Sequence, residues 1–118
     1  MPKGPTTTDL EIEPLFRAVS FFASECGDFT PQLLKVFLYI AVHNGCRLDD
    51  ISKGLGMTSA AVTHMVNWLS DGSYKNHKPL GWVVKRQDVI DHRAKNVILT
   101  KTGTAVVTNL KAQLYPDL

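Results

Sequence analysis

A chain of 118 residues is long enough for one hydrophobic core and too short for two. Its 44% apolar and 20% charged residues are typical of a globular protein. The longest apolar run, residues 36–42, is far shorter than the ~20 residues of a membrane span. Residues 1–9 lack the apolar stretch of a secretory signal and predict a flexible tail. We therefore expect a cytoplasmic protein, not associated with a membrane, with a single domain over residues 10–118.

The net charge of +2 conceals a gradient along the chain. Residues 1–30 carry an excess of three acidic side chains, whereas residues 72–101 carry seven basic and two acidic ones. Such a local excess of positive charge attracts a polyanion, although an ordinary solvated surface can show the same count. The charge distribution alone leaves both interpretations open.

Two helices are predicted in the N-terminal part of the chain. Residues 14–26 begin with Pro and place apolar residues at helical spacing, namely Leu15, Val19, Phe22 and Ala23. The second helix begins at Pro31, with Thr30 as N-cap, and ends before Gly45. Apolar residues cover most of its circumference and indicate a central, buried helix: Leu33, Leu34, Phe37, Leu38, Ile40 and Ala41.

Residues 48–70 predict a short helix, a turn and a second helix. Asp49 or Asp50 would cap the short helix, Gly56 would end it, and Thr58 would cap the second helix. That second helix has an apolar face made of Val62, Met65, Val66 and Leu69. Its other face is small and polar: Ser59, Ala60, Thr63, His64 and Asn67. This is the pattern of a helix-turn-helix whose second helix fits a major groove ~12 Å wide.

A loop over residues 70–81 leads to a predicted hairpin over about residues 82–100. Two β-branched runs, 82–86 and 96–100, flank a charged tip. The charged side chains around that tip are Lys85, Arg86, Asp88, Asp91, Arg93 and Lys95. A last helix over about residues 101–115 is capped by Thr100 and carries the apolar stripe Val106, Val107, Leu110 and Leu114. The predicted fold is mainly α with a small β-hairpin, a winged helix-turn-helix.

The hairpin and the helix-turn-helix together resemble the MarR family of transcription regulators. Residues 91–103, DHRAKNVILTKTG, are similar to that family's wing motif: an acidic residue, any residue, Arg, a strand, Leu-Thr and a following Gly. Residues 48–69 are similar to its helix-turn-helix, and the resemblance spans about residues 30–110. It implies a homodimer that binds a pseudo-palindromic site on double-stranded DNA and regulates transcription.

The resemblance also implies roles for individual residues. Ser59, Ala60, Thr63, His64 and Asn67 would form the recognition face in the major groove. In the wing, Arg93 would enter the minor groove with Asp91 as its positioner, while Lys85, Arg86 and Lys95 would contact phosphates. The alternative for Asp91 and Arg93 is a surface ion pair worth ~0–1 kcal/mol.

The chain departs from the family pattern in three places. His64 stands where the family often has Arg, which removes a bidentate contact to guanine. Residues 73–79 resemble an insertion, which either adds phosphate contacts through Lys75 and Lys78 or is only a longer loop. The C-terminal helix is short for a family that dimerises through its terminal helices. Apolar surface for such an interface is predicted from Phe16, Phe21, Phe22, Val107 and Leu110.

No other chemistry is indicated by the sequence. Its four histidines have no metal-site spacing, there is no phosphate loop or nucleophile motif, and Cys26 and Cys46 are interpreted as packed thiols. We expect neither an enzyme, a metal nor a cofactor, and nothing identifies a small-molecule effector. The alternative to a DNA-binding regulator is a winged helix that docks on the transcription or replication machinery.

Overall fold

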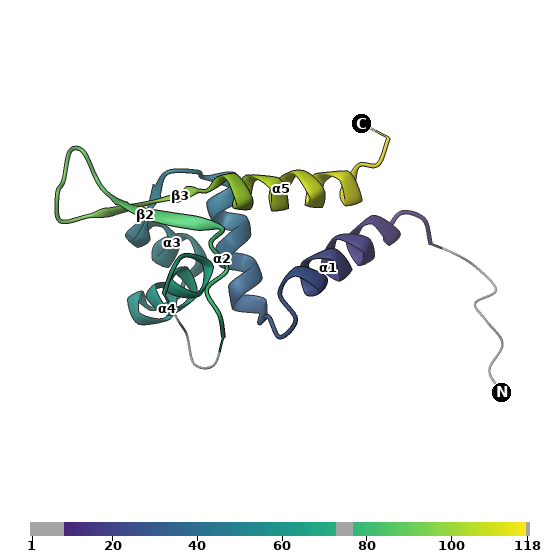
Figure 1. The fold of residues 1–118 in the computed structure, drawn as a ribbon, viewed down its shortest axis with the longest axis horizontal. Coiled ribbons are helices and arrows are strands. Elements are labelled where there is room, and N and C mark those ends of the chain that lie inside the picture. Colours follow the sequence, from purple (N-terminus) through teal and green to yellow (C-terminus); the bar gives the residue numbers. More distant parts are fainter. Residues whose placement is uncertain (1–8, 73–76, 118) are drawn as a thin grey trace.

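The computed structural model describes residues 9–72 and 77–117, which contain five α-helices and one three-stranded antiparallel sheet (Figure 1). The bounds are α1 Glu13–Glu25, α2 Pro31–Val42, β1 Cys46–Arg47, α3 Leu48–Leu55, α4 Ser59–Leu69, β2 Val83–Gln87, β3 Lys95–Leu99 and α5 Lys101–Leu114. The predicted flexible tail lies outside the described residues except for Asp9. None of the helices in the described ranges combines the length and the apolar character needed to cross a membrane.

The predicted fold class, a winged helix-turn-helix, is confirmed. Helices α3 and α4 pack on each other and on α2, and the β2–β3 hairpin follows α4 as the wing. Figure 1 shows the hairpin extending beyond the helices at one end of the molecule, while α1 and α5 lie side by side at the other end. The wing and the terminal helices are therefore separated in space.

Three threonines begin helices as predicted. The Oγ1 of Thr30 accepts a hydrogen bond from the Leu33 N–H at 3.2 Å, and Thr58 accepts one from Ala61 at 3.2 Å. Thr100 caps α5 in the same way, with 3.0 Å to the Gly103 N–H. Each bond satisfies one of the amides that a helix leaves unpaired at its N-terminus. Gly56 has φ 63° at the C-cap of α3, a left-handed conformation that favours glycine.

The start of α3 differs from the prediction. The helix begins at Leu48, so neither Asp49 nor Asp50 is the N-cap residue. Arg47 occupies that position in an extended conformation because it belongs to β1, which pairs with β3. The Asp50 carboxylate instead accepts a hydrogen bond from the Arg47 backbone N–H at 3.0 Å. The two-residue strand β1 is missing from the sequence-based prediction, since it has no alternation to detect.

The wing strands are shifted by one residue from the predicted runs 82–86 and 96–100. In the observed register Val83 pairs with Leu99, and Gln87 pairs with Lys95. Trp82 precedes the first strand and is buried. Thr100 leaves the second strand because its side chain is used at the start of α5, where it also donates to the Gly81 carbonyl at 2.7 Å. The tip of the wing therefore comprises residues 88–94.

The core joins the terminal helices to the base of the wing. Phe22, Phe37 and Trp82 meet with ring centroids 5.1–5.9 Å apart, mostly edge to face. On α4 the predicted apolar face is buried, and Trp68 is buried beside it. The prediction that Leu15, Val19 and Leu38 face inward is wrong, because these side chains are 53%, 39% and 43% exposed. Helices α1 and α2 each bury a narrower face than their composition suggests.

Candidate nucleic-acid interface

The outer face of α4 is small, polar and open to solvent, as predicted. Ser59, Ala60, Thr63 and His64 are exposed, whereas Asn67 is half-buried. The face exists because Val62, Met65, Val66 and Leu69 hold the opposite side of the helix in the core. Hydroxyl groups and a methyl group on an exposed helix can reach base edges without a steric barrier.

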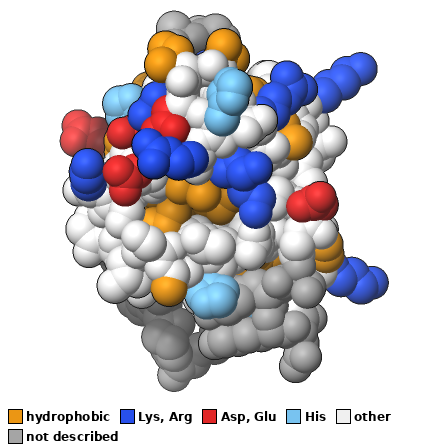
Figure 2. Space-filling model, turned by 90° about the vertical axis from the view of Figure 1, so that its left-hand side faces the viewer, with side chains coloured by type: hydrophobic (Ala, Val, Ile, Leu, Met, Phe, Trp, Pro, Cys, Tyr) orange, Lys and Arg blue, Asp and Glu red, His pale blue; other side chains and the backbone are white. Residues whose placement is uncertain are grey.

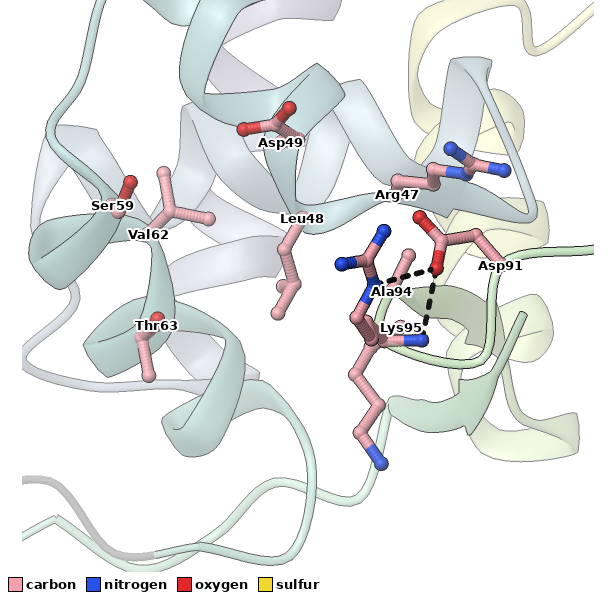
Figure 3. Close-up of a pocket in the computed structure, with 10 residues that line it drawn as sticks. Arg47, Leu48, Asp49, Ser59, Val62, Thr63, Asp91, Ala94 and Lys95 are labelled. Atoms are coloured by element: carbon pink, nitrogen blue, oxygen red, sulfur yellow. Dashed lines mark hydrogen bonds and ion pairs between the residues drawn. The ribbon is translucent and has the colours of Figure 1, made fainter.

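A cleft of about 550 Å³ separates α4 from the wing. Figure 3 shows Ser59 and Thr63 on one side of it, Asp91 and Lys95 on the other, and Leu48 between them. The side view in Figure 2 shows Lys and Arg side chains gathered over this end of the molecule, with acidic side chains beside them. Ser59 and Thr63 of the predicted recognition face thus border the same cleft as Arg93 and Lys95 of the predicted wing. The other predicted recognition and basic wing residues do not line it: Ala60, His64, Asn67, Lys85 and Arg86.

Asp88 organises the wing tip, a role that the sequence analysis missed. This residue is only 6% exposed. Its Oδ1 accepts hydrogen bonds from the backbone N–H groups of Ile90 at 2.8 Å and Asp91 at 2.9 Å. Its Oδ2 accepts from Arg47 Nε at 3.0 Å, which joins the tip to the residue preceding α3. One carboxylate therefore shapes the turn and anchors the wing to the helix-turn-helix.

The contacts of Asp88 and Arg47 determine the direction in which their pKa values are shifted. The hydrogen bond from the Asp91 N–H lowers the pKa of Asp88, and those from Ile90 and Arg47 lower it further, although burial opposes them. The hydrogen bond and charge of Asp88 in turn raise the pKa of Arg47. Both groups are therefore charged at neutral pH, and the anchor is an ionised one.

Arg93 and Asp91 form the predicted pair, and they do so within a turn. The Asp91 Oδ1 accepts hydrogen bonds from the Arg93 backbone N–H at 3.1 Å and from its Nε at 3.5 Å. The Ala94 N–H donates to the Asp91 carbonyl at 2.9 Å, so residues 91–94 form the turn that leads into β3. The Arg93 side chain is 95% exposed and borders the cleft.

Lys85 and Asn67 bind each other. The Lys85 Nζ donates to the Asn67 Oδ1 at 2.7 Å, which links β2 to the end of α4. The predicted DNA contacts of these two residues, Lys85 with a phosphate and Asn67 with a base, stay predictions. Their mutual hydrogen bond links the recognition helix to the wing. Arg86 and Lys95, by contrast, are exposed on the wing strands.

The predicted insertion is only partly described. Lys75 lies outside the described residues, and Lys78 is exposed. His77 stacks on Trp68 with ring centroids 4.0 Å apart and an interplanar angle of 18°. The Leu80 N–H then donates to the Trp68 carbonyl at 2.9 Å. The end of this loop is therefore attached to the C-terminal part of α4.

Two of the five predicted dimer-interface residues are corrected by their burial. Phe22 is 0% exposed, with its ring against Phe37 and Trp82. Leu110 is 7% exposed on α5, which packs on α1 within the chain. Phe16 is 70% exposed, while Phe21 and Val107 are half-buried. Exposed apolar side chains continue along the N-terminal segment and α1, namely Leu10, Ile12, Leu15 and Val19.

The thiols and histidines form no reactive centre within residues 9–72 and 77–117. Burial, followed by the charge of Asp28, raises the pKa of Cys26. Burial and then Asp50 raise the pKa of Cys46 to about 11. Both thiols are therefore protonated and unreactive at neutral pH. No group of three His, Cys, Asp or Glu side chains in the described part of the chain is placed to hold a metal ion.

The fold of this chain, a winged helix-turn-helix, is similar to that of several solved structures. Similar solved structures include Rv1404 from Mycobacterium tuberculosis, with TM-score 0.69, 16% identity, and 87% of this chain matched to 65% of that one. The complex of S. aureus MepR with DNA gives TM-score 0.66 and 22% identity, with 86% and 83% covered. CouR bound to a 23-mer DNA duplex gives 0.64 and 20%, with 91% and 68% covered.

The structural match covers most of this chain but a smaller share of the chains that it resembles. The chain spans about two thirds of the length of the Rv1404 and YusO structures, 65% and 66%. No protein-family model and no curated protein sequence matches the chain.

Proposed function

We propose that this protein is a cytoplasmic transcription regulator of the MarR type, which binds double-stranded DNA as a homodimer. The observation that carries the proposal is the shared cleft, with the polar face of α4 on one side and the basic wing on the other. In this arrangement α4 enters a major groove while the wing follows the adjacent minor groove. Two structural neighbours support it, since the MepR and CouR structures are each complexes with DNA.

The recognition face reads the major groove through small side chains. The Ser59 and Thr63 hydroxyls and the His64 ring are exposed for hydrogen bonds to base edges, and the Ala60 methyl suits the methyl group of thymine. Asn67 orients α4 through its bond to Lys85. Base selectivity on this surface is modest, because none of these groups forms the bidentate contact of Arg with guanine.

The wing supplies the charge. Arg93 carries a 95% exposed guanidinium that Asp91 holds at its base. A narrow minor groove concentrates negative potential, so a guanidinium placed there gains more than at an open phosphate. Arg86 and Lys95 contact phosphates on the groove rims, and Lys78 adds another contact. Lys85 contributes through its brace to α4 and through its charge.

A two-fold dimer would present two such wings. The exposed apolar residues of the N-terminal segment and α1 supply its interface, with Phe16 at the centre and Phe21 and Val107 at the edge. The DNA site is then a pseudo-palindrome with half-sites ~10 bp apart or a multiple of that spacing. Selection of bound fragments from random duplex DNA tests binding and symmetry together. A recovered site without symmetry, covered by a monomer, would refute the dimeric mode.

The wing is tested by fluorescence anisotropy on one selected duplex at several salt concentrations. Arg93→Ala should cost ~1–3 kcal/mol of binding free energy, and Lys95→Ala should lower the salt slope by ~0.9 for one lost phosphate contact. Asp91→Ala should weaken binding if the carboxylate positions Arg93, and tighten it if the carboxylate only repels phosphates. Lys111→Ala, an exposed lysine on α5, is the matched control and should change neither quantity. Absence of duplex binding at low salt would refute the proposal and favour the protein-docking alternative.

A further inference from the structure

Two apolar side chains in the tip of the wing are almost wholly exposed. Val89 is 90% and Ile90 is 91% exposed, and among the large apolar residues of the described ranges no other exceeds 74%. Both lie in the seven-residue tip between β2 and β3, at the end of the hairpin that Figure 1 shows extending beyond the helices. Neither side chain has a packing role within the chain, since each is almost wholly in solvent.

The exposure is maintained by the backbone of the tip. The Asp88 carboxylate accepts the N–H groups of both Ile90 and Asp91, and it is itself fixed by Arg47. The Asp88 N–H donates to the Ala94 carbonyl at 3.0 Å, and the Gln87 Nε2 donates to the His92 carbonyl at 2.7 Å. A turn with this many bonds cannot collapse readily onto the protein. Val89 and Ile90 are therefore presented at little entropic cost on binding.

The surroundings of this pair identify the partner. Arg86, Arg93 and Lys95 are exposed on the two strands and the turn behind it, so an apolar point is flanked by cations. A DNA minor groove has the complementary form, with phosphates on both rims and deoxyribose walls ~6 Å apart. Short β-branched side chains fit such a width, and apolar residues can enter between base steps there. The same hairpin borders the cleft between α4 and the wing. This position favours DNA over a lipid surface as the partner.

We propose that Val89 and Ile90 form an apolar wedge that enters the minor groove of the bound duplex and disfavours the guanine 2-amino group. The proposal rests on the proposed function and adds a source of selectivity that requires no recognition by α4. Guanine places an amino group in the minor groove, whereas A·T pairs leave that space open. A wedge at this position selects base pairs by the depth and deformability of the groove.

The test compares two duplexes of about 30 base pairs, enough for two half-sites. One contains G·C pairs, and in the other inosine replaces every guanine, which removes the minor-groove amino group and leaves the major-groove edge unchanged. At about 0.5 M salt, where charges are screened within about 5 Å, the wild-type protein should bind the inosine duplex roughly tenfold more tightly. The double variant Val89→Ser/Ile90→Ser should bind both duplexes within about twofold of each other.

Two control variants separate the wedge from other effects. Val42→Ser also removes an exposed valine, on α2, and should retain the wild-type preference. Arg93→Ala should weaken binding to both duplexes and lower the salt slope, while the preference at high salt persists. A double variant that keeps the inosine preference overturns the wedge and leaves DNA binding intact. The wedge is also overturned if the double variant loses binding to anionic lipid vesicles while its binding to both duplexes is unchanged. A wild-type protein that binds neither duplex at low salt overturns the wedge and the proposed function together.

Discussion

Among the glycines of the described residues, replacement of Gly103 should destabilise the fold most. This glycine is buried in the first turn of α5, where an added Cβ would lie 1.9 Å from the Trp82 carbonyl oxygen and 2.8 Å from its carbonyl carbon. The same oxygen accepts a hydrogen bond from the Thr100 N–H at 3.0 Å. Helix α5 can therefore meet the base of the wing only with glycine at this position. The contact explains the glycine that follows Leu-Thr in the wing motif.

The cost of Gly103→Ala follows from the overlap. Ordinary contacts of a Cβ begin near 3.4 Å, whereas the Cβ of an alanine at position 103 would lie 1.9 Å from the Trp82 oxygen. The backbone of α5 or of Trp82 must therefore move by about 1.5 Å. In a helix, Ala is otherwise favoured over Gly by ~0.5–1 kcal/mol. Overpacking typically costs 1–3 kcal/mol, and movement of the Trp82 carbonyl also endangers its bond to Thr100. We expect a net loss of about 3 kcal/mol in unfolding free energy, or roughly 12 °C in Tm.

Thermal and urea unfolding followed by circular dichroism measure this loss. Gly27→Ala is the matched control, since a Cβ there meets nothing within 4 Å and the backbone needs no left-handed conformation. That variant should be as stable as the wild type or slightly more stable. A Gly103→Ala protein with wild-type stability would refute the close approach of α5 to Trp82, the residue that precedes β2.

Three further predictions concern the anchor, the interface and the thiols. Asp88→Asn keeps an acceptor for the turn amides but faces Arg47 with an amide, so unfolding free energy at pH 7 should fall. Because the pKa of Asp88 is lowered from 3.8, its stabilisation is complete above that pH and is lost as pH falls through the lower value, so urea titrations of both proteins should converge in acid. Phe16→Asp should give a folded monomer by light scattering, whereas Phe22→Asp should not fold, and equal behaviour would contradict the assignment. With a pKa of about 11, Cys46 should react with dithiobis-nitrobenzoate at pH 8 about a hundredfold more slowly than in guanidinium, and equal rates would exclude its burial.

Much of the fold could be predicted because the features that define it are local. The caps Thr30, Thr58 and Thr100 each accept an N–H only three residues away, so their effect is visible in a short window of sequence. The apolar face of α4 repeats at helical spacing, and its outer face follows by exclusion. These features were sufficient for a winged helix-turn-helix and for the identity of the candidate recognition residues.

The predictions that were wrong inferred burial of a side chain from its apolar character alone. The apolar residues of α1 outnumber those that a single chain can bury, and the sequence does not say which of them face inward. Tertiary packing places Phe22 inside, at 0% exposed, and leaves Phe16 outside at 70%. Periodicity gives a helix a face but not a partner, so the division of these apolar residues between core and surface could be read only from the tertiary structure.

The charges of the wing divide in the same way. The sequence by itself determined that a basic hairpin follows a helix-turn-helix, and that Asp91 and Arg93 lie within reach of each other. Only the tertiary structure decided that Asp88 binds Arg47, 41 residues away, and that Lys85 binds Asn67, 18 residues away. Such pairs depend on which surfaces the core brings together, and no local pattern encodes their distance. The physical reason is that a carboxylate and a guanidinium select each other by proximity in the folded state, whereas a cap selects its amide along the chain.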